Sequence, residues 1–288
     1  MTRERPVGGP QALAFEVVDV FTDRPFAGNP LAVVLDADEL STQQLQAIAR
    51  EFNLSETAFP LKAPAGATYG LRIFTPATEL PFAGHPSVGT AWLLHRLGRI
   101  DAGPNVQACG AGLLPVDVTS TGATLAGGEP SLSEPLDPAP LLAALGLSPD
   151  DLAGPEPRWA GVGIDWAYLL VRREALARVR VDAPLVAALG RSGIALVSWD
   201  GAIARSRVFP GGLGVVEDPA TGSAALGLGV YLASSLGDGE HRYVVEQGHE
   251  MGRPGTLMCS VTVASGVAVS TTVSGRVVPV SKGEIAVP

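Results

Sequence analysis

The sequence predicts an α+β protein built from two pseudo-symmetric lobes, and three observations support this fold class. Short apolar segments recur between turns rich in the chain's 35 glycines and 24 prolines, a pattern typical of many short strands. Two helix-forming segments of small and apolar residues lie among these strands, one in each half. The heptapeptide HPSVGTA at residues 85–91 matches DPATGSA at residues 218–224, which indicates that the halves are related.

Composition limits the class of protein and its partners. The 288 residues, 46% of them hydrophobic, suffice for two ordinary lobes with apolar cores. A net charge of -9 disfavours nucleic acid and anionic membrane surfaces as partners. No apolar stretch is long enough to span a membrane, and polar residues 1–11 predict a short disordered lead without a signal peptide. We therefore expect a cytoplasmic protein with no membrane and no nucleic-acid partner.

Cysteines, histidines and short motifs exclude several kinds of site. Cys109 and Cys259 are too few for a disulfide framework and are predicted to be free thiols in a reducing compartment. The histidines show no metal-binding spacing: His85, His95, His241 and His249. The sequence contains no P-loop, no dinucleotide fingerprint and no GxSxG elbow. These features disfavour a metal site and nucleotide, nicotinamide or serine-hydrolase chemistry.

The first half begins with strands and a capped helix. Strands are predicted at residues 13–21 and 31–35, joined by the turn-rich segment DRPFAGNP. Ser41 opens a helix, because it precedes Gln44 at the spacing of a capping box. The buried face of this helix is marked by a stripe at i, i+3, i+4 and i+7, formed by Leu45, Ile48, Ala49 and Phe52.

The central helix of the first half is predicted to begin at His85 and Pro86, because proline is favoured in the first turn of a helix. Strands at residues 56–61 and 69–75 and a loop rich in proline and glycine precede it. One face of the helix carries Val88, Ala91, Trp92 and His95. Short strands and turns follow over residues 106–126.

The lobe boundary is predicted near residues 127–130, which gives lobes of residues 12–127 and 128–281, with final strands able to pack back on the first lobe. The second lobe repeats the order of elements. Its helices are predicted at residues 141–145, 184–189 and 222–233. Its strands are predicted at residues 166–171, 194–199, 205–209, 243–246, 257–263, 267–273 and 277–280.

The repeat places two loop-to-helix junctions in equivalent positions. In each half a strand with the pattern Arg-x-Phe, at residues 72–74 and 207–209, precedes the matched heptapeptide. If the lobes face each other, both helix N-termini point into one cleft, where free N–H groups favour an anion such as a carboxylate. Gly89 and Gly222 would let the backbone approach closely. The alternative is that these small residues serve only tight helix packing.

Glu56 is the candidate acid/base. It lies between a helix end and an apolar strand, where burial would raise its pKa, and the alternative is a solvated glutamate on a turn. His85 and Asp218 occupy matched positions of the repeat, where they could orient a polar substrate or share a proton. For Asp218, ordinary helix capping is the alternative. Ser223 could hydrogen-bond a substrate oxygen.

Five segments of the chain together match a known family. They are VDVFTDRPFAGNPLAVV, NLSETAF, TPATELPFAGHPSVGTA, EDPATGSAA and QGHEMGRPG, and they extend over most of the chain. In this order they resemble the PhzF-like family of phenazine biosynthesis. The resemblance implies the diaminopimelate-epimerase fold, in which each lobe wraps a mostly antiparallel sheet around a central helix and the active site lies between the lobes. It also implies a homodimer that uses no cofactor.

The resemblance also assigns roles to residues. The phenazine enzyme of this family isomerises 2,3-dihydro-3-hydroxyanthranilate by moving a proton between ring carbons, and its acid/base glutamate matches Glu56. Its other site positions match His85, Asp218, Gly84 and Ser223. Together with the repeat, this predicts Glu56, His85 and Asp218 as catalytic residues and Gly84, Gly222 and Ser223 as substrate-binding residues.

The sequence therefore predicts a cofactor-independent isomerase that acts on a small anionic acid. Related epimerases use two opposed thiols at the helix junctions, where this chain has no cysteine, and Cys109 in the string CGAG only mimics that motif. The alternatives are a metabolite-binding protein without catalysis and an epimerase that uses Glu56 with another group. The loops expected to set specificity carry no readable code: residues 23–29, 75–81 and 211–216.

Overall fold

The computed structural model describes residues 12–212 and 215–288. The lead predicted at residues 1–11 lies outside the described residues, as do residues 213–214 of one predicted specificity loop. The first half of the described chain contains, in order, β1 (Ala12–Val20), β2 (Asn29–Val34), α1 (Thr42–Phe52), β3 (Glu56–Leu61), β4 (Tyr69–Phe74), β5 (Glu79–Leu80), α2 (Gly84–Arg96), β6 (Gly103–Cys109), β7 (Gly112–Val118) and β8 (Gly122–Ala126).

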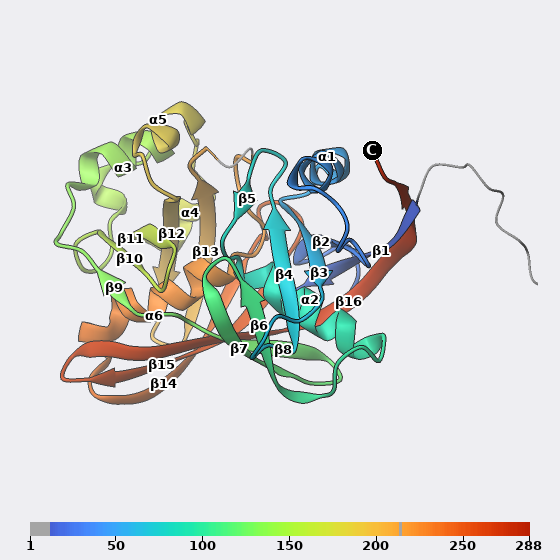
Figure 1. Ribbon diagram of the computed structural model, residues 1–288. Coiled ribbons are helices and arrows are strands. Elements are labelled where there is room, and N and C mark those ends of the chain that lie inside the picture. Colours follow the sequence, from blue (N-terminus) through green and yellow to red (C-terminus); the bar gives the residue numbers. More distant parts are fainter. Residues whose placement is uncertain (1–11, 213–214) are drawn as a thin grey trace, which may run out of the picture.

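The second half repeats this alternation with additional helices (Figure 1). It contains β9 (Ser131–Leu132), α3 (Pro138–Leu145), the 3-10 turn η1 (Pro149–Asp151), β10 (Arg158–Gly161), β11 (Asp165–Leu170), α4 (Arg173–Leu176), α5 (Ala183–Ala188), β12 (Gly193–Trp199), β13 (Ile203–Pro210), α6 (Gly222–Leu236), β14 (Gly239–Gln247), β15 (Gly255–Ala264) and β16 (Val267–Ala286).

Within the described residues the strands form one continuous sheet, which closes around α2 and curls around α6. The order β1-β2-β3-β4-β6-β7-β8-β16 returns to its start because β16 also pairs with β1. From β16 the sheet continues through β15, β14, β13, β12, β11, β10 and β9. Most pairs are antiparallel, and the parallel ones are β2–β3, β4–β6, β11–β12 and β13–β14. This arrangement confirms the predicted α+β class.

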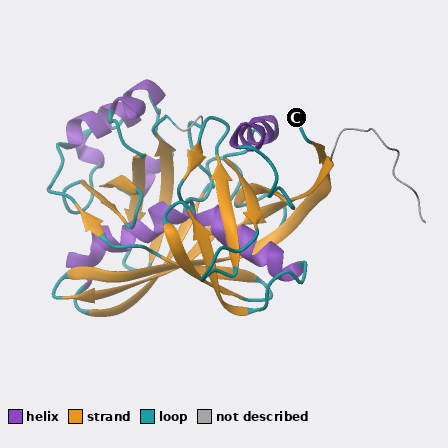
Figure 2. Ribbon diagram, viewed as in Figure 1, coloured by secondary structure: helices purple, strands orange, loops and turns teal. Residues whose placement is uncertain are grey.

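The two central helices are buried on all sides, which explains why their sequences are small and apolar rather than amphipathic. Figure 2 shows α2 and α6 running through the interior, with the other helices outside the sheet. A Cβ atom on Gly89 would lie 2.7 Å from side-chain carbons of both Val20 and Leu31. A Cβ atom on Gly227 would lie 2.5 Å from the Tyr168 hydroxyl. Glycine therefore lets each helix approach the surrounding strands.

The outer helix α1 forms as predicted. Ser41 Oγ accepts a hydrogen bond from the Gln44 backbone at 3.3 Å, and the Gln44 side chain accepts one from the Ser41 backbone at 3.0 Å. Asn53 ends the helix in the left-handed conformation, with a φ of 52°. The apolar stripe of α1 packs outside the sheet against Phe59 and Phe74.

The structure also differs from the predictions. Residues 267–273 and 277–280, expected as two strands, belong to the single strand β16. Between them Gly275 packs closely on Phe21, since a Cβ atom there would lie 2.3 Å from the Phe21 ring. Helix α3 begins before residue 141, since Asp137 caps it and a proline follows. The short elements β9, β10 and α4 were not predicted. The lobe limits at residues 127 and 281 stay predictions, and β16 pairs with strands of both halves.

Candidate functional site

The N-termini of α2 and α6 meet in the middle of the molecule and line one cleft. A Cβ atom on Gly84 would lie 3.0 Å from Gly222 Cα and 3.1 Å from the Ser223 backbone nitrogen. The cleft has a volume of about 200 Å³. The structure brings all the predicted site residues to its wall: Glu56, Gly84, His85, Asp218, Gly222 and Ser223. The repeat thus correctly predicted that both junctions face the same space.

Glu56, the first residue of β3, faces this cleft in a largely buried position. Its side chain is 15% exposed, but its Oε2 atom is buried and has no hydrogen-bond partner among the described residues. Burial, followed by the nearby charge of Asp218, raises the pKa of Glu56 to about 8, against the opposing effect of Ser55. A carboxyl group with this raised pKa exists in both its protonated and its ionised form around neutral pH, and the alternative of a solvated turn glutamate is wrong.

His85, the second residue of α2, lies beside Glu56. Its Nε2 atom is 3.6 Å from Glu56 Oε2 and likewise has no hydrogen-bond partner among the described residues. Burial lowers the pKa of His85 to about 3, so the imidazole is neutral at physiological pH. The contact is consequently not an ion pair. The two polar atoms lack hydrogen-bond partners in the described structure, and a small movement or a bound ligand could join them by a hydrogen bond.

Asp218 lies on the opposite side of the cleft and is fully hydrogen-bonded. Its Oδ2 accepts from Thr221 Oγ1 at 2.5 Å, and its Oδ1 accepts from Asn29 Nδ2 at 2.9 Å. Gln247 Nε2 donates to the Asp218 carbonyl at 2.7 Å. Burial raises the pKa of Asp218, while the hydrogen bonds from Thr221 and Asn29 lower it. The N-cap of α6 is Thr221, so the capping interpretation of Asp218 is wrong.

An apolar wall completes the cleft. It is formed by Leu80, Pro81, Ile164, Trp166, Pro210 and Val215. The indole Nε1 of Trp166 donates to Ser223 Oγ at 3.1 Å, which fixes the ring and leaves the Ser223 hydroxyl free to donate. No lysine or arginine lines the cleft within the described part of the chain. An anion bound here would therefore be held by hydroxyl groups and by the N–H groups at the helix N-termini.

Three predicted features have a different role or position. Gly89 packs α2 against the sheet, so the packing interpretation is correct for this glycine. Cys109 ends β6 half-buried and Cys259 is buried on β15, both as free thiols outside the cleft wall. This agrees with the absence of cysteine from the helix junctions. In the described ranges, no cluster of three or more histidine, cysteine, aspartate or glutamate residues could hold a metal ion.

The sequence interpretation missed three polar residues of the site: Asn29, Gln247 and Trp166. Asn29 begins β2 and is fully buried, and Gln247 ends β14 and is almost as buried. Both lie in segments that carry the family resemblance, GNP and QGH. The available signal was an uncharged amide at the first or last residue of a strand. Trp166 was recognised only as part of a strand.

Among the described residues, no helix is both long and apolar enough to cross a membrane.

Known proteins resemble the chain over most of its length. The profile of the family described as "Phenazine biosynthesis-like protein" matches residues 18–283. A trans-2,3-dihydro-3-hydroxyanthranilate isomerase from Pseudomonas fluorescens is 35% identical, and the match covers 94% of this chain and 98% of that protein. A PhzF-family protein structure from Bacillus anthracis superposes with a TM-score of 0.87 at 26% identity, covering 96% and 99% of the two chains.

A more distant structure shares the fold. A hydroxyproline epimerase from Agrobacterium vitis is only 14% identical, yet it superposes with a TM-score of 0.64 over 96% of this chain and 92% of its own. These two structures together confirm the diaminopimelate-epimerase-like fold implied by the sequence motifs.

Proposed function

The chain belongs to the phenazine biosynthesis-like (PhzF) family, and on that basis we propose that it is an isomerase that moves a proton on a small anionic acid. Glu56 acts as the general acid/base. The observation that carries this proposal is the meeting of a buried Glu56, whose pKa burial raises to about 8, with a neutral His85 in one small cleft. A carboxyl group that titrates near neutral pH is suited both to accept and to return a proton.

The cleft supports a substrate with one ring and one carboxylate. Its volume of about 200 Å³ admits a small molecule, and its apolar wall suits a ring. The N–H groups at the starts of α2 and α6, with the Ser223 hydroxyl, would hold the carboxylate. The name of the Pseudomonas fluorescens relative makes trans-2,3-dihydro-3-hydroxyanthranilate the first compound to test.

The reaction we propose conserves all atoms and electrons. Ionised Glu56 removes a proton from carbon, and the electron pair of the broken C–H bond shifts the adjacent double bond. Protonated Glu56, whose proton exchanges with solvent, then delivers a proton to a different carbon of the same molecule. His85 Nε2, which lies 3.6 Å from Glu56 Oε2, forms a hydrogen bond with this carboxyl group after a small movement, and Asp218 orients polar substituents. General acid/base transfer of this kind typically contributes about 10²–10⁴-fold, so positioning in the cleft must supply much of the remaining acceleration.

The test is to incubate the protein with trans-2,3-dihydro-3-hydroxyanthranilate in D₂O and follow the products by NMR. We expect isomerised, deuterated product from the wild type and a loss of about 10²–10⁴-fold in turnover for Glu56→Gln. Glu51→Gln, at an exposed position of α1, is the matched control and should retain full activity. Full turnover by Glu56→Gln would contradict the assigned role.

The same spectra distinguish the other functions. Exchange at a stereocentre without migration of a double bond would indicate an epimerase. Binding of the compound without chemical change in any sample would indicate a metabolite-binding protein on the same scaffold.

A further inference from the structure

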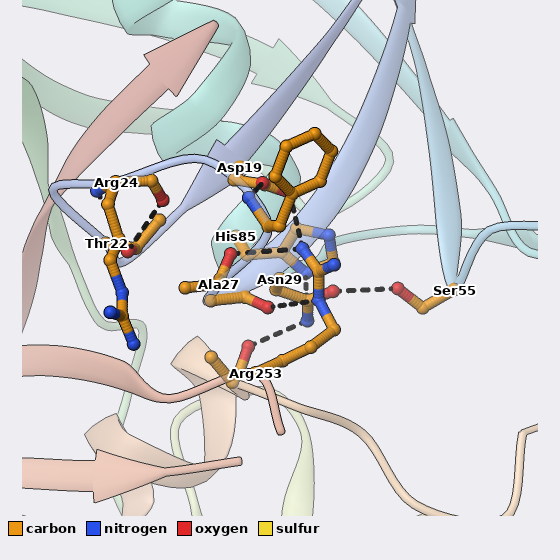
Figure 3. Close-up of polar contacts among 11 residues, drawn as sticks. Asp19, Thr22, Arg24, Ala27, Asn29, Ser55, His85 and Arg253 are labelled. Carbon is orange, nitrogen blue, oxygen red and sulfur yellow. Dashed lines mark hydrogen bonds and ion pairs between the residues drawn. The ribbon is translucent and has the colours of Figure 1, made fainter. Parts of the chain in front are cut away.

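Asn29 touches the segments that carry all three predicted catalytic groups. Its side chain is fully buried at the start of β2. Its Nδ2 atom lies 2.9 Å from Asp218 Oδ1, 2.8 Å from the Ala220 carbonyl oxygen and 3.2 Å from His85 Nδ1. Its Oδ1 accepts from Ser55 Oγ, next to Glu56, at 3.0 Å, and Figure 3 shows it between Ser55 and His85. One amide therefore connects the two sides of the cleft.

Its partners determine the orientation of this amide. The Ala220 carbonyl can only accept a hydrogen bond, and so can an ionised Asp218 carboxylate. The amide nitrogen, which carries two hydrogens, must face these two acceptors, and this leaves Oδ1 for the Ser55 hydroxyl. Both hydrogens are thus donated to the α6 side of the cleft, although Asn29 itself belongs to the α2 side.

Arg253 holds the loop that leads into Asn29. Its guanidinium pairs with Asp19 at 2.5 Å and donates to the carbonyl oxygens of Ala27 and Gly28, each at 3.0 Å (Figure 3). Asp19 also accepts from the backbone of Phe26 at 2.6 Å. Arg253 lies between β14 and β15, so it connects the second half to this loop just outside the contact made by Asn29. The two residues immediately before Asn29 are held by their carbonyl groups.

We propose that Asn29 is a positioning residue, which holds the Asp218 carboxylate and the start of α6 in register with Glu56 and His85 across the cleft. The role assigned to Glu56 rests on the proposed function, whereas the contact between Asn29 and Asp218 does not. A neutral amide can make these contacts without adding a charge to a cleft that already holds two carboxyl groups.

The surroundings of Asp218 explain why one amide matters. Titratable groups face it from β3 (Glu56) and from α2 (His85), and Glu217 is its neighbour in the chain. Glu217 is itself paired with Arg207 of β13 at 2.7 Å. The carboxylate of Asp218 accepts from two neutral donors, Thr221 and Asn29. Loss of one donor should therefore disfavour its ionised form and raise its pKa.

The test is an NMR titration of protein labelled with ¹³C at the aspartate carboxyl groups. The Asp218 signal is identified by its loss in Asp218→Asn. In Asn29→Ala we expect its midpoint to move upward by about one pH unit. Asn105→Ala is the matched control, because buried Asn105 also donates to two carbonyl oxygens, those of Asp101 and Gly103, outside the cleft wall. This control should lose stability without moving the Asp218 midpoint.

A second variant keeps the test decisive if Asn29→Ala does not fold. Asn29→Asp has the same shape and retains the acceptor for Ser55, but it sets an oxygen against Asp218, so the upward shift should be larger. An unchanged Asp218 midpoint in a folded Asn29 variant would overturn the proposal. The titration needs no turnover, so this failure is distinct from failure of the proposed function, which Glu56→Gln reports.

Discussion

The two helix junctions in the cleft are flanked by the same kind of ion pair, but the two ion pairs differ in how exposed they are. In both halves an arginine forms a two-pronged ion pair with a glutamate and lies over the phenylalanine two residues ahead: Arg72 with Glu79 and Phe74, and Arg207 with Glu217 and Phe209. The side chains of the first ion pair are 28% and 38% exposed, and those of the second are 12% and 13% exposed.

The polar groups beside these two ion pairs differ more, in how completely they are hydrogen-bonded. On the α2 side, Glu56 Oε2 and His85 Nε2 lack partners in the described structure. On the α6 side, both Asp218 oxygens accept hydrogen bonds and Ser223 accepts from Trp166. The hydrogen bonds to Asp218 favour its ionised form and oppose the effect of burial, whereas the unsatisfied groups of Glu56 and His85 are available to a ligand. We therefore propose that the duplicated scaffold gives one rigid side, around Asp218, and one reactive side, around Glu56 and His85.

Among the changes that test the difference between the two sides, replacement of Asp218 should reduce turnover the most. Asp218→Asn removes the carboxyl group while keeping the shape of the side chain, so we expect turnover of trans-2,3-dihydro-3-hydroxyanthranilate to fall about 10³-fold. Since the charge of Asp218 also contributes to the raised pKa of Glu56, the Glu56 titration should move to lower pH. Steady-state kinetics and carboxyl NMR check both effects. Wild-type turnover in this variant would contradict the division between the two sides.

The two ion pairs, Arg207 with Glu217 and Arg72 with Glu79, provide the next test. Arg207→Met should lower the free energy of unfolding by about 3 kcal/mol, because it leaves Glu217 poorly solvated and without its cation. The matched change Arg72→Met, at a more exposed pair, should cost roughly 0–1 kcal/mol. Urea unfolding of both variants measures the difference. Equal losses in the free energy of unfolding would show that the two ion pairs stabilise the fold equally.

The smallest effect is expected at Trp166. Trp166→Phe keeps the apolar wall but removes the N–H that donates to Ser223. We expect KM to rise by roughly 3–10-fold with little change in kcat, since one neutral hydrogen bond is typically worth about 1 kcal/mol. A large loss of kcat with unchanged KM would place Trp166 on the reactive side instead.

The repeat accounts for how much of the site the sequence could predict. Matched heptapeptides located both junctions, and all six predicted site residues line the cleft because each half supplies one helix N-terminus to it. For Glu56 the sequence left both a buried and a solvated side chain open, and the structure shows it largely buried. The roles themselves stay proposals, as do the homodimer and the cytoplasmic location.

Contacts between distant segments could not be predicted in the same way. Asn29 and Asp218 are 189 positions apart, and nothing in either local pattern reveals their hydrogen bond. The gap between the strands predicted at residues 267–273 and 277–280 lies inside β16, and the close approach of Gly275 to Phe21 in this gap arises only when the sheet closes. Periodicity and capping report local structure, whereas these features depend on which strands become neighbours.

Glu56 should also make stability depend on pH in a definite direction. In the folded state it keeps its proton up to about pH 8, while its ordinary value is 4.5. The unfolded chain therefore binds fewer protons at this site between these pH values, and the contribution of Glu56 to stability falls as pH rises through them. Glu56→Gln should accordingly be more stable than the wild type at pH 8 and similar to it at pH 4.

The most direct measurement is the titration of the Glu56 carboxyl group itself, by ¹³C NMR of protein labelled at the glutamate carboxyl groups. Its signal is identified by its loss in Glu56→Gln. A midpoint near pH 8 would show that the reactive side holds an exchangeable proton at neutral pH, as the structure predicts. A midpoint near the ordinary value of 4.5 would show that the cleft does not raise the pKa of Glu56, and it would contradict the division into a rigid side and a reactive side.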